Sequence, residues 1–245
     1  MSRGRRIAVA VAWGLVNHSL FVCAIAAMVV SLYGVMQIGL GGLRGTAALA
    51  GNTLLALQFP VLHSLLLTPR GRSLLARLAP GDVGRQLTPT TFAAFASVQL
   101  LATFLLWSPT GLVLYEAAGN AAWAWRVLFA ASWIFLVKAL YDARLPIQTG
   151  SIGWVSVVRG KAPDFGSFPT DGLFRRCRQP VYLAFALTLW TGPVLTVDRL
   201  ALALTWTVYC VVGPMHKERR YISYYGERYA SYRRSVSYIL PGLKP

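Results

Sequence analysis

The chain has 245 residues, of which 56% are hydrophobic and 13% charged, and its formal net charge is +16. A soluble domain carries roughly 25% charged residues, so this composition excludes an ordinary soluble enzyme. The positive charge would suggest nucleic-acid binding in a soluble protein, but the Lys and Arg residues lie between long apolar runs. We therefore predict one integral membrane domain over residues 1–245, surrounded by membrane lipids and without a nucleic-acid partner.

Cysteine and histidine usage gives no sign of a disulfide framework or a metal centre. The three cysteines are widely spaced and odd in number, and the chain has only three histidines. Neither set has the spacing of a ligand group. We predict no metal site.

Four apolar runs of membrane length come first in the chain. Their lengths and hydropathy predict spans over about 12–36, 46–67, 91–107 and 122–140. Asn17, His18 and Ser19 lie inside the first span, where interhelical hydrogen bonding and a functional polar cluster are both open interpretations. Between the second and third spans, the basic segment Gly71 to Leu78 predicts a short interfacial helix.

The second half of the chain predicts a helical hairpin. The segment Ser108 to Asn120 is expected to be a loop, and Tyr141 to Gln179 is a long polar stretch. The apolar run Val181 to Pro214 is interrupted by Thr191-Gly192-Pro193 and Asp198-Arg199, so two short antiparallel helices fit better than one. Each arm has about 15 residues, fewer than the roughly 20 that cross a bilayer freely.

The distribution of Lys and Arg predicts the orientation of the chain. With six crossings and a cytoplasmic N-terminus, 20 of the 24 basic residues fall in cytoplasmic segments. The predicted fold class is thus all-α, a polytopic membrane bundle of about five to six transmembrane segments. Its last two segments form the short hairpin, and a cytoplasmic C-terminal helix follows. Both termini are expected in the cytoplasm, with a bacterial inner membrane as the location.

Two clusters of polar residues flank the hairpin. In Arg178-Gln179-Pro180, Gln179 should be non-helical because it precedes a proline, and Pro180 suits the first helical position. Arg178 then lies beside a helix N-terminus, which favours an anion; anchoring to lipid headgroups is the alternative. After the hairpin, Glu218 could orient an amine or accept a proton, or form an ordinary ion pair with a nearby arginine.

A tyrosine stripe follows Glu218. Tyr221, Tyr225, Tyr229 and Tyr232 recur at steps of four, four and three, which places them on one helical face with Glu218. Such a stripe packs on the bundle or at the membrane interface, or it covers a pocket by gripping a base or a cation. Gly226-Glu227 is expected to interrupt this helix.

These motifs together resemble a known family. Gly-Leu-Phe at 172–174, Arg-x-Pro-x-Tyr at 178–182, Glu-Arg at 218–219 and Gly-x-x-Tyr-x-x-Tyr-x-x-x-Val at 226–236 resemble the isoprenylcysteine carboxyl methyltransferase superfamily. The chain is most similar to its bacterial methanethiol S-methyltransferase and NnrU-like branch, over about residues 50 to 241. The resemblance implies a membrane methyltransferase that uses S-adenosylmethionine and methylates a small thiol or another apolar or lipid-like acceptor.

The resemblance also implies the site, within a cofactor-binding part at about 142–241. Arg178 and Glu218 would be catalytic. The implied cofactor-binding residues are Leu173, Gln179, Tyr182, Arg219, Tyr229, Tyr232 and, from the second span, His63.

Three residues depart from the family pattern. Gln179 replaces a histidine, Lys217 replaces the first of two glutamates, and Leu62 replaces a glutamine. Two other functions therefore stay open: a non-catalytic NnrU-like membrane protein, and a nicotinamide-dependent membrane reductase, because sterol reductases share the Gly-x-x-Tyr-x-x-Tyr region.

Overall fold

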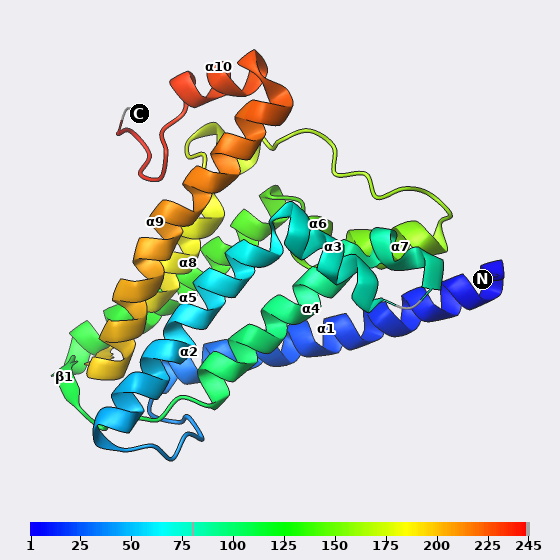
Figure 1. Ribbon diagram of the computed structural model, residues 1–245. Helices are drawn as coiled ribbons and strands as arrows, with labels where there is room; N and C mark the ends of the chain where they lie inside the picture. Colours follow the sequence, from blue (N-terminus) through cyan, green and yellow to red (C-terminus); the bar gives the residue numbers. More distant parts are fainter. Residues whose placement is uncertain (80, 244–245) are drawn as a thin grey trace. The chain divides into compact units, whose positions relative to one another are not determined.

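The computed structural model describes residues 1–79 and 81–243 (Figure 1). The chain divides into two compact units. Unit 1 comprises Met1–Pro109 and Leu145–Gly166, and unit 2 comprises Thr110–Arg144 and Ser167–Pro245.

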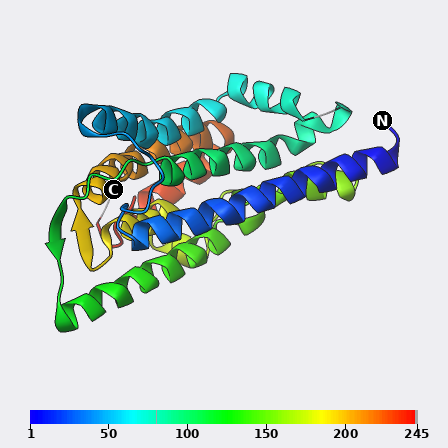
Figure 2. The same cartoon turned by 90° about the horizontal axis from the view of Figure 1, so that it is seen from below.

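Unit 1 is helical. Its long helices are α1 (Arg3–Tyr33), α2 (Gly45–Leu66) and α4 (Gly84–Leu105), and its short ones are α3 (Pro69–Leu78), η1 (Gly81–Val83), α6 (Leu145–Gln148) and α7 (Ser151–Val158). Helices α1 and α4 lie side by side in both views (Figures 1 and 2). An apolar core joins α1, η1, α4 and α7 through Ala10, Val83, Leu87 and Val157.

The polar residues inside α1 bind neighbouring elements of unit 1. Asn17 Nδ2 donates to the carbonyl of Thr149 at 2.9 Å, and Trp154 Nε1 donates to His18 Nε2 at 3.1 Å. A Cβ on Gly14 would lie 2.8 Å from the Trp154 ring, so glycine is needed for this close approach. Asn17 and His18 therefore both hydrogen-bond to neighbouring elements of unit 1.

Unit 2 carries the motifs that flank the hairpin. It contains β1 (Val113–Glu116), α5 (Gly119–Asp142), η2 (Gly172–Arg175), α8 (Pro180–Trp190), β2 (Val194–Thr196), α9 (Val197–Tyr225) and α10 (Glu227–Ser235). Helix α8 packs against both α5 and α9. Its contact with α5 is apolar, through Leu136, Ala139 and Ala184.

Among the described residues, four helices are long and apolar enough to cross a membrane: Arg3–Tyr33, Gly45–Leu66, Gly81–Leu105 and Gly119–Asp142. Each overlaps one of the four predicted spans, although the first and third begin earlier than predicted, and α3 overlaps the predicted interfacial helix. The protein is thus a multi-pass integral membrane protein. The crossings by the hairpin and the orientation stay predictions.

Two sequence-based expectations need correction. The segment 108–120, expected to be a loop, contains β1, which pairs antiparallel with β2 in the hairpin turn. The β-favouring residues of Val-Leu-Tyr-Glu explain the strand. The hairpin arms are also unequal, because α8 has 11 residues and α9 has 29. Helix α9 continues through Pro214 to Tyr225, and Gly226 then ends it as predicted.

Arg199, in the first turn of α9, is buried. Its Nε donates to the carbonyl of Leu189 at 2.9 Å, its Nη1 to that of Val194 at 3.2 Å, and its Nη2 to that of Thr191. The last carbonyls of a helix have no intrahelical partner. Arg199 therefore satisfies the C-terminal end of α8.

Candidate functional site

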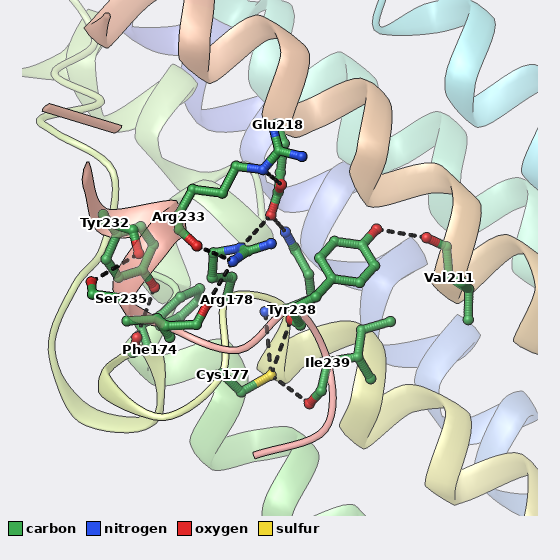
Figure 3. A network of polar contacts seen from close by, with 12 residues as sticks. Phe174, Cys177, Arg178, Val211, Glu218, Tyr232, Arg233, Ser235, Tyr238 and Ile239 are labelled. Atoms are coloured by element: carbon green, nitrogen blue, oxygen red, sulfur yellow. Dashed lines mark hydrogen bonds and ion pairs between the residues drawn. The ribbon is translucent and has the colours of Figure 1, made fainter. Parts of the chain in front are cut away.

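Arg178 lies at the centre of a buried polar cluster in unit 2 (Figure 3). Only 4% of the residue is exposed. Its Nε donates to Glu218 Oε1 at 2.9 Å, and its Nη1 donates to the carbonyls of Arg233 and Val236. These carbonyls belong to the C-terminal end of α10 and the residue that follows it. One side chain therefore neutralises Glu218 and caps α10.

Glu218 is the anion of the cluster. Besides Arg178, its Oε1 accepts a hydrogen bond from Gln179 Nε2 at 2.8 Å, and its Oε2 lies 3.6 Å from Arg233 Nε. The ion pair with an arginine, one of the two interpretations of Glu218 from sequence, is present. It is buried, so removing one partner would leave an uncompensated charge.

The turn before α8 places Arg178 and Gln179 in this cluster. Gln179 is non-helical at the N-cap and Pro180 begins α8, as the sequence predicts. The Arg178 N–H donates to the carbonyl of Ser237 at 2.9 Å, which ties the turn to the C-terminal segment. Gln179 Oε1 is a buried acceptor without a hydrogen-bond partner within the described part of the chain.

The tyrosine stripe surrounds Phe168. This ring lies 5.0 Å from the rings of Tyr225 and Tyr229 and 5.5 Å from that of Tyr232. Although Gly226 breaks the helix, Tyr221 and Tyr229 remain in contact, 5.3 Å apart. The sequence did not single out Phe168, because it lies in a polar stretch without periodicity.

Burial keeps the phenols of this cluster protonated. Burial raises the pKa of Tyr229, and the nearby Glu218 carboxylate raises it further. Burial likewise raises the pKa of Tyr232, whose hydroxyl donates to the carbonyl of Phe174 at 2.7 Å. Tyr238, with its ring 5.4 Å from the Arg178 guanidinium, has a pKa raised to about 12 by burial. These side chains are hydrogen-bond donors rather than bases.

Lys217, which precedes Glu218 on α9, adds a cation that faces two tyrosine rings. Its ammonium lies 5.2 Å from the centroid of the Tyr182 ring and 6.0 Å from that of Tyr221. Burial lowers its pKa from 10.5 to about 8, although Glu218 opposes this shift. The sequence had marked Lys217 only as a departure from the family pattern.

Asp142, at the end of α5, holds the start of η2. Its Oδ2 accepts a hydrogen bond from the Leu173 N–H at 2.9 Å, and its Oδ1 accepts one from Lys138. Gly172 has φ +60°, and a Cβ there would lie 2.3 Å from the Asp142 carboxylate. The Leu173 side chain packs on the apolar core between α5 and α8.

The structure thus brings together five of the residues that the resemblance implies: Arg178, Gln179, Glu218, Tyr229 and Tyr232. Tyr182 joins them through Lys217, whereas Arg219 is exposed on α9. His63 belongs to unit 1, where its ring lies 5.0 Å from Phe59 and 4.7 Å from Phe92.

The apolar helices and the buried charged cluster define a class, a multi-pass membrane protein with a polar site on its C-terminal helices. The model of the DUF1295 family, described as proteins of unknown function, matches residues 80–236, and the chain belongs to this family.

Curated relatives include two enzymes. The chain is 28% identical over 198 residues to methanethiol S-methyltransferase of Pseudomonas deceptionensis, covering 80% of this chain and 74% of that protein. It is 28% identical over 202 residues to methanethiol S-methyltransferase of Mycobacterium tuberculosis, covering 79% and 78%. The resemblance to this branch is therefore confirmed.

A third relative has a different name. Nurim of Mus musculus is 30% identical over 170 residues, covering 66% of this chain and 64% of that protein. No solved structure matches the chain.

Proposed function

We propose that this protein is a membrane methyltransferase that transfers the methyl group of S-adenosylmethionine to a small thiol or another apolar acceptor. The observation that carries the proposal is the buried pair of Arg178 and Glu218, 40 positions apart in sequence. Its members come from the two motifs that the methyltransferase resemblance singles out. Relatives named methanethiol S-methyltransferases support the same reaction.

The residues of the cluster fit the cofactor. The orphaned acceptor Gln179 Oε1 can accept a hydrogen bond from the ammonium of its amino-acid end. The N-terminus of α8, at Pro180, favours a carboxylate. The tyrosine faces around Phe168 suit a sulfonium or an adenine ring.

Arg178 and Glu218 have different roles in this proposal. The Nε and Nη1 donors of Arg178 are engaged by Glu218 and by two carbonyls. Arg178 is therefore a positioning residue, which holds Glu218 and the end of α10. Glu218 is the fixed negative charge toward a cationic ligand.

The bound cofactor supplies an electrophilic methyl group. The chain must hold the acceptor in line with that methyl group, about 3 Å away, and exclude water. The tyrosines stay protonated because burial raises their pKa values. They can therefore orient groups without competing as nucleophiles.

Methyl transfer by the purified full-length protein tests the proposal. With methyl-labelled S-adenosylmethionine and a panel of small thiols, wild type should label at least one thiol. Glu218→Gln should lower kcat/KM about 100-fold or more, because it removes the fixed charge. Glu227→Gln, at an exposed ion pair with Arg234, should retain activity. Absence of both transfer and S-adenosylhomocysteine binding in wild type would contradict the proposal.

One observation favours a second candidate, a non-catalytic membrane protein. Phe168 already fills the aromatic face that the first proposal gives to the cofactor. In that case Glu218→Gln would complement a deletion strain as well as wild type does. Stabilisation of the protein by NADPH, rather than by S-adenosylhomocysteine, would instead indicate the reductase alternative.

A further inference from the structure

Lys217 is a half-buried cation without an anion of its own. Within residues 1–79 and 81–243, no carboxylate lies at ion-pair distance from its ammonium. The neighbouring Glu218 is already bound by Arg178, Gln179 and Arg233. The groups that face Lys217 are two aromatic rings, one thiol, one carboxylate and one guanidinium: Tyr182, Tyr221, Cys177, Glu218 and Arg220.

Two titratable neighbours of Lys217 hold their protons more tightly than usual because they are buried. Burial raises the pKa of Tyr221, and burial also raises that of Cys177, whose thiol donates to the carbonyl of Ile239 at 2.9 Å. Glu218 already pairs with Arg178 and Arg233. His216 is exposed on α9. Lys217, whose pKa burial lowers to about 8, is the amine that can exchange a proton near neutral pH.

We propose that Lys217 is a catalytic residue that takes the proton of a thiol acceptor and then holds the thiolate as its counter-ion. The inference rests on the proposed function and narrows its acceptor to thiols. Thiols react as thiolates, and a free thiol has a pKa of about 8.5. The Lys217 amine and such a thiol therefore share a proton at little cost. Alcohols hold their proton far more tightly, and carboxylates need no base.

The step balances without another reactant. The neutral Lys217 amine accepts the thiol proton and becomes an ammonium. The thiolate sulfur forms a bond to the methyl carbon of the donor as the bond between that carbon and the sulfonium sulfur breaks. The products are a methyl thioether and S-adenosylhomocysteine, and the ammonium returns its proton to solvent.

Kinetics against pH test this role with a matched control. Lys217→Met should lower kcat/KM for a thiol about 100-fold at pH 7. Its affinity for S-adenosylhomocysteine should stay within twofold of wild type. The loss of kcat/KM in Lys217→Met should shrink as pH rises above the pKa of the thiol, because solvent then removes the thiol proton. Lys161→Met, which removes an exposed lysine, should match wild type.

Amine labelling gives a readout that is independent of turnover. At pH 8, an acylating reagent should modify Lys217 faster than Lys161 in the same wild-type protein, as followed by peptide mass spectrometry. A saturating thiol should protect Lys217 alone. This measurement needs no variant, so it decides the proposal even if Lys217→Met fails to fold.

Each contrary outcome has a distinct meaning. Kcat/KM of Lys217→Met within threefold of wild type at pH 7, or no protection by thiol, overturns the role of Lys217. Weakened S-adenosylhomocysteine binding in that variant would make Lys217 the partner of the cofactor carboxylate and also overturn the role. Wild type that binds S-adenosylhomocysteine but methylates no thiol overturns this inference alone. Wild type that does not bind it overturns the proposed function.

Discussion

Glu218 neutralises a guanidinium that has almost no access to water, so its charge should matter to stability as well as to function. Removing one partner of a buried ion pair costs about 3–5 kcal/mol. We expect Glu218→Gln to lower the unfolding free energy by about that amount, measured by thermal unfolding in detergent.

The matched control for Glu218 is Glu227, which pairs with Arg234 on the surface. Their side chains are 77% and 66% exposed. Such a pair contributes about 0–1 kcal/mol, so Glu227→Gln should unfold close to the wild-type temperature. Equal losses of unfolding free energy in the two variants would show that the buried pair stabilises the fold no more than the surface pair does.

Lys217 gives a second residue-scale prediction, with the opposite sign. The unfolded chain holds the lysine proton up to about pH 10.5, whereas the folded chain releases it near pH 8. Between these values the unfolded state binds more protons, so the stability of the folded state rises with pH. Below pH 8 the folded state bears the full cost of burying the charged ammonium. Lys217→Met should therefore raise the melting temperature at pH 7, by about 2–4 °C for a gain on the order of 1 kcal/mol.

The gain from Lys217→Met should shrink toward pH 10, because the wild-type lysine is then neutral in the folded state. Scanning calorimetry or fluorescence at pH 7 and pH 10 checks this. A loss of stability at pH 7 would contradict the burial cost assigned to the ammonium. A variant that is more stable but less active is expected when the substituted residue belongs to a functional site.

At the scale of elements, turns hold the residues of the site in place, and Gly172 is a turn residue with little room for a side chain. Gly172→Ala adds a left-handed strain of about 1–2 kcal/mol. It also pushes the Asp142 carboxylate away from the Leu173 N–H, which costs about 1–3 kcal/mol. We expect the unfolding free energy to fall by about 2–5 kcal/mol in total, measured by chemical or thermal unfolding.

Gly160 separates these two contributions. Its φ is +66°, close to that of Gly172, but a Cβ there would meet nothing within 4 Å. Gly160→Ala should therefore lose only the stability that the left-handed strain costs, about 1–2 kcal/mol. Losses of the same size at both glycines would rule out the contact with Asp142 as a source of stability.

The sequence predicts elements that its own periodicity or punctuation marks. The four apolar spans, the start of α8 at Pro180 and the break at Gly226 all follow from such local signals. Strands β1 and β2 do not, because three or four residues give too little alternation to recognise. Helix α9 packs against α8 and continues through Pro214, and no local signal in the sequence indicates this continuation.

In the site, too, the sequence predicts some features and misses others. The sequence offered an ion pair as one interpretation of Glu218 and placed the tyrosines on a common face, and Arg178 and Phe168 supply the partners. It missed Phe168, since a single aromatic residue in a Gly-Pro-rich stretch has no period. It also gave no sign that Arg199 is buried, because the partners of this side chain are backbone carbonyls of Leu189, Thr191 and Val194.

The positive-inside distribution makes a prediction for the whole molecule. In a Cys23→Ser background, Gly42→Cys should react with a membrane-impermeant maleimide on intact cells, because residue 42 lies in a predicted outer loop. A Cβ there meets nothing within 4 Å, so the substitution is tolerated. Leu243→Cys should react only after permeabilisation. Labelling of Leu243→Cys in intact cells would contradict the cytoplasmic C-terminus.

Cofactor binding by the full-length protein tests the central claim most directly. Calorimetric titration of the detergent-purified protein with S-adenosylhomocysteine should show one saturable site in wild type. Binding should weaken at least tenfold in Gln179→Leu, which removes the buried acceptor Oε1, and stay unchanged in Lys161→Met. A cooperative unfolding transition shows that the wild-type sample is folded. If such a sample does not bind S-adenosylhomocysteine, the account is contradicted.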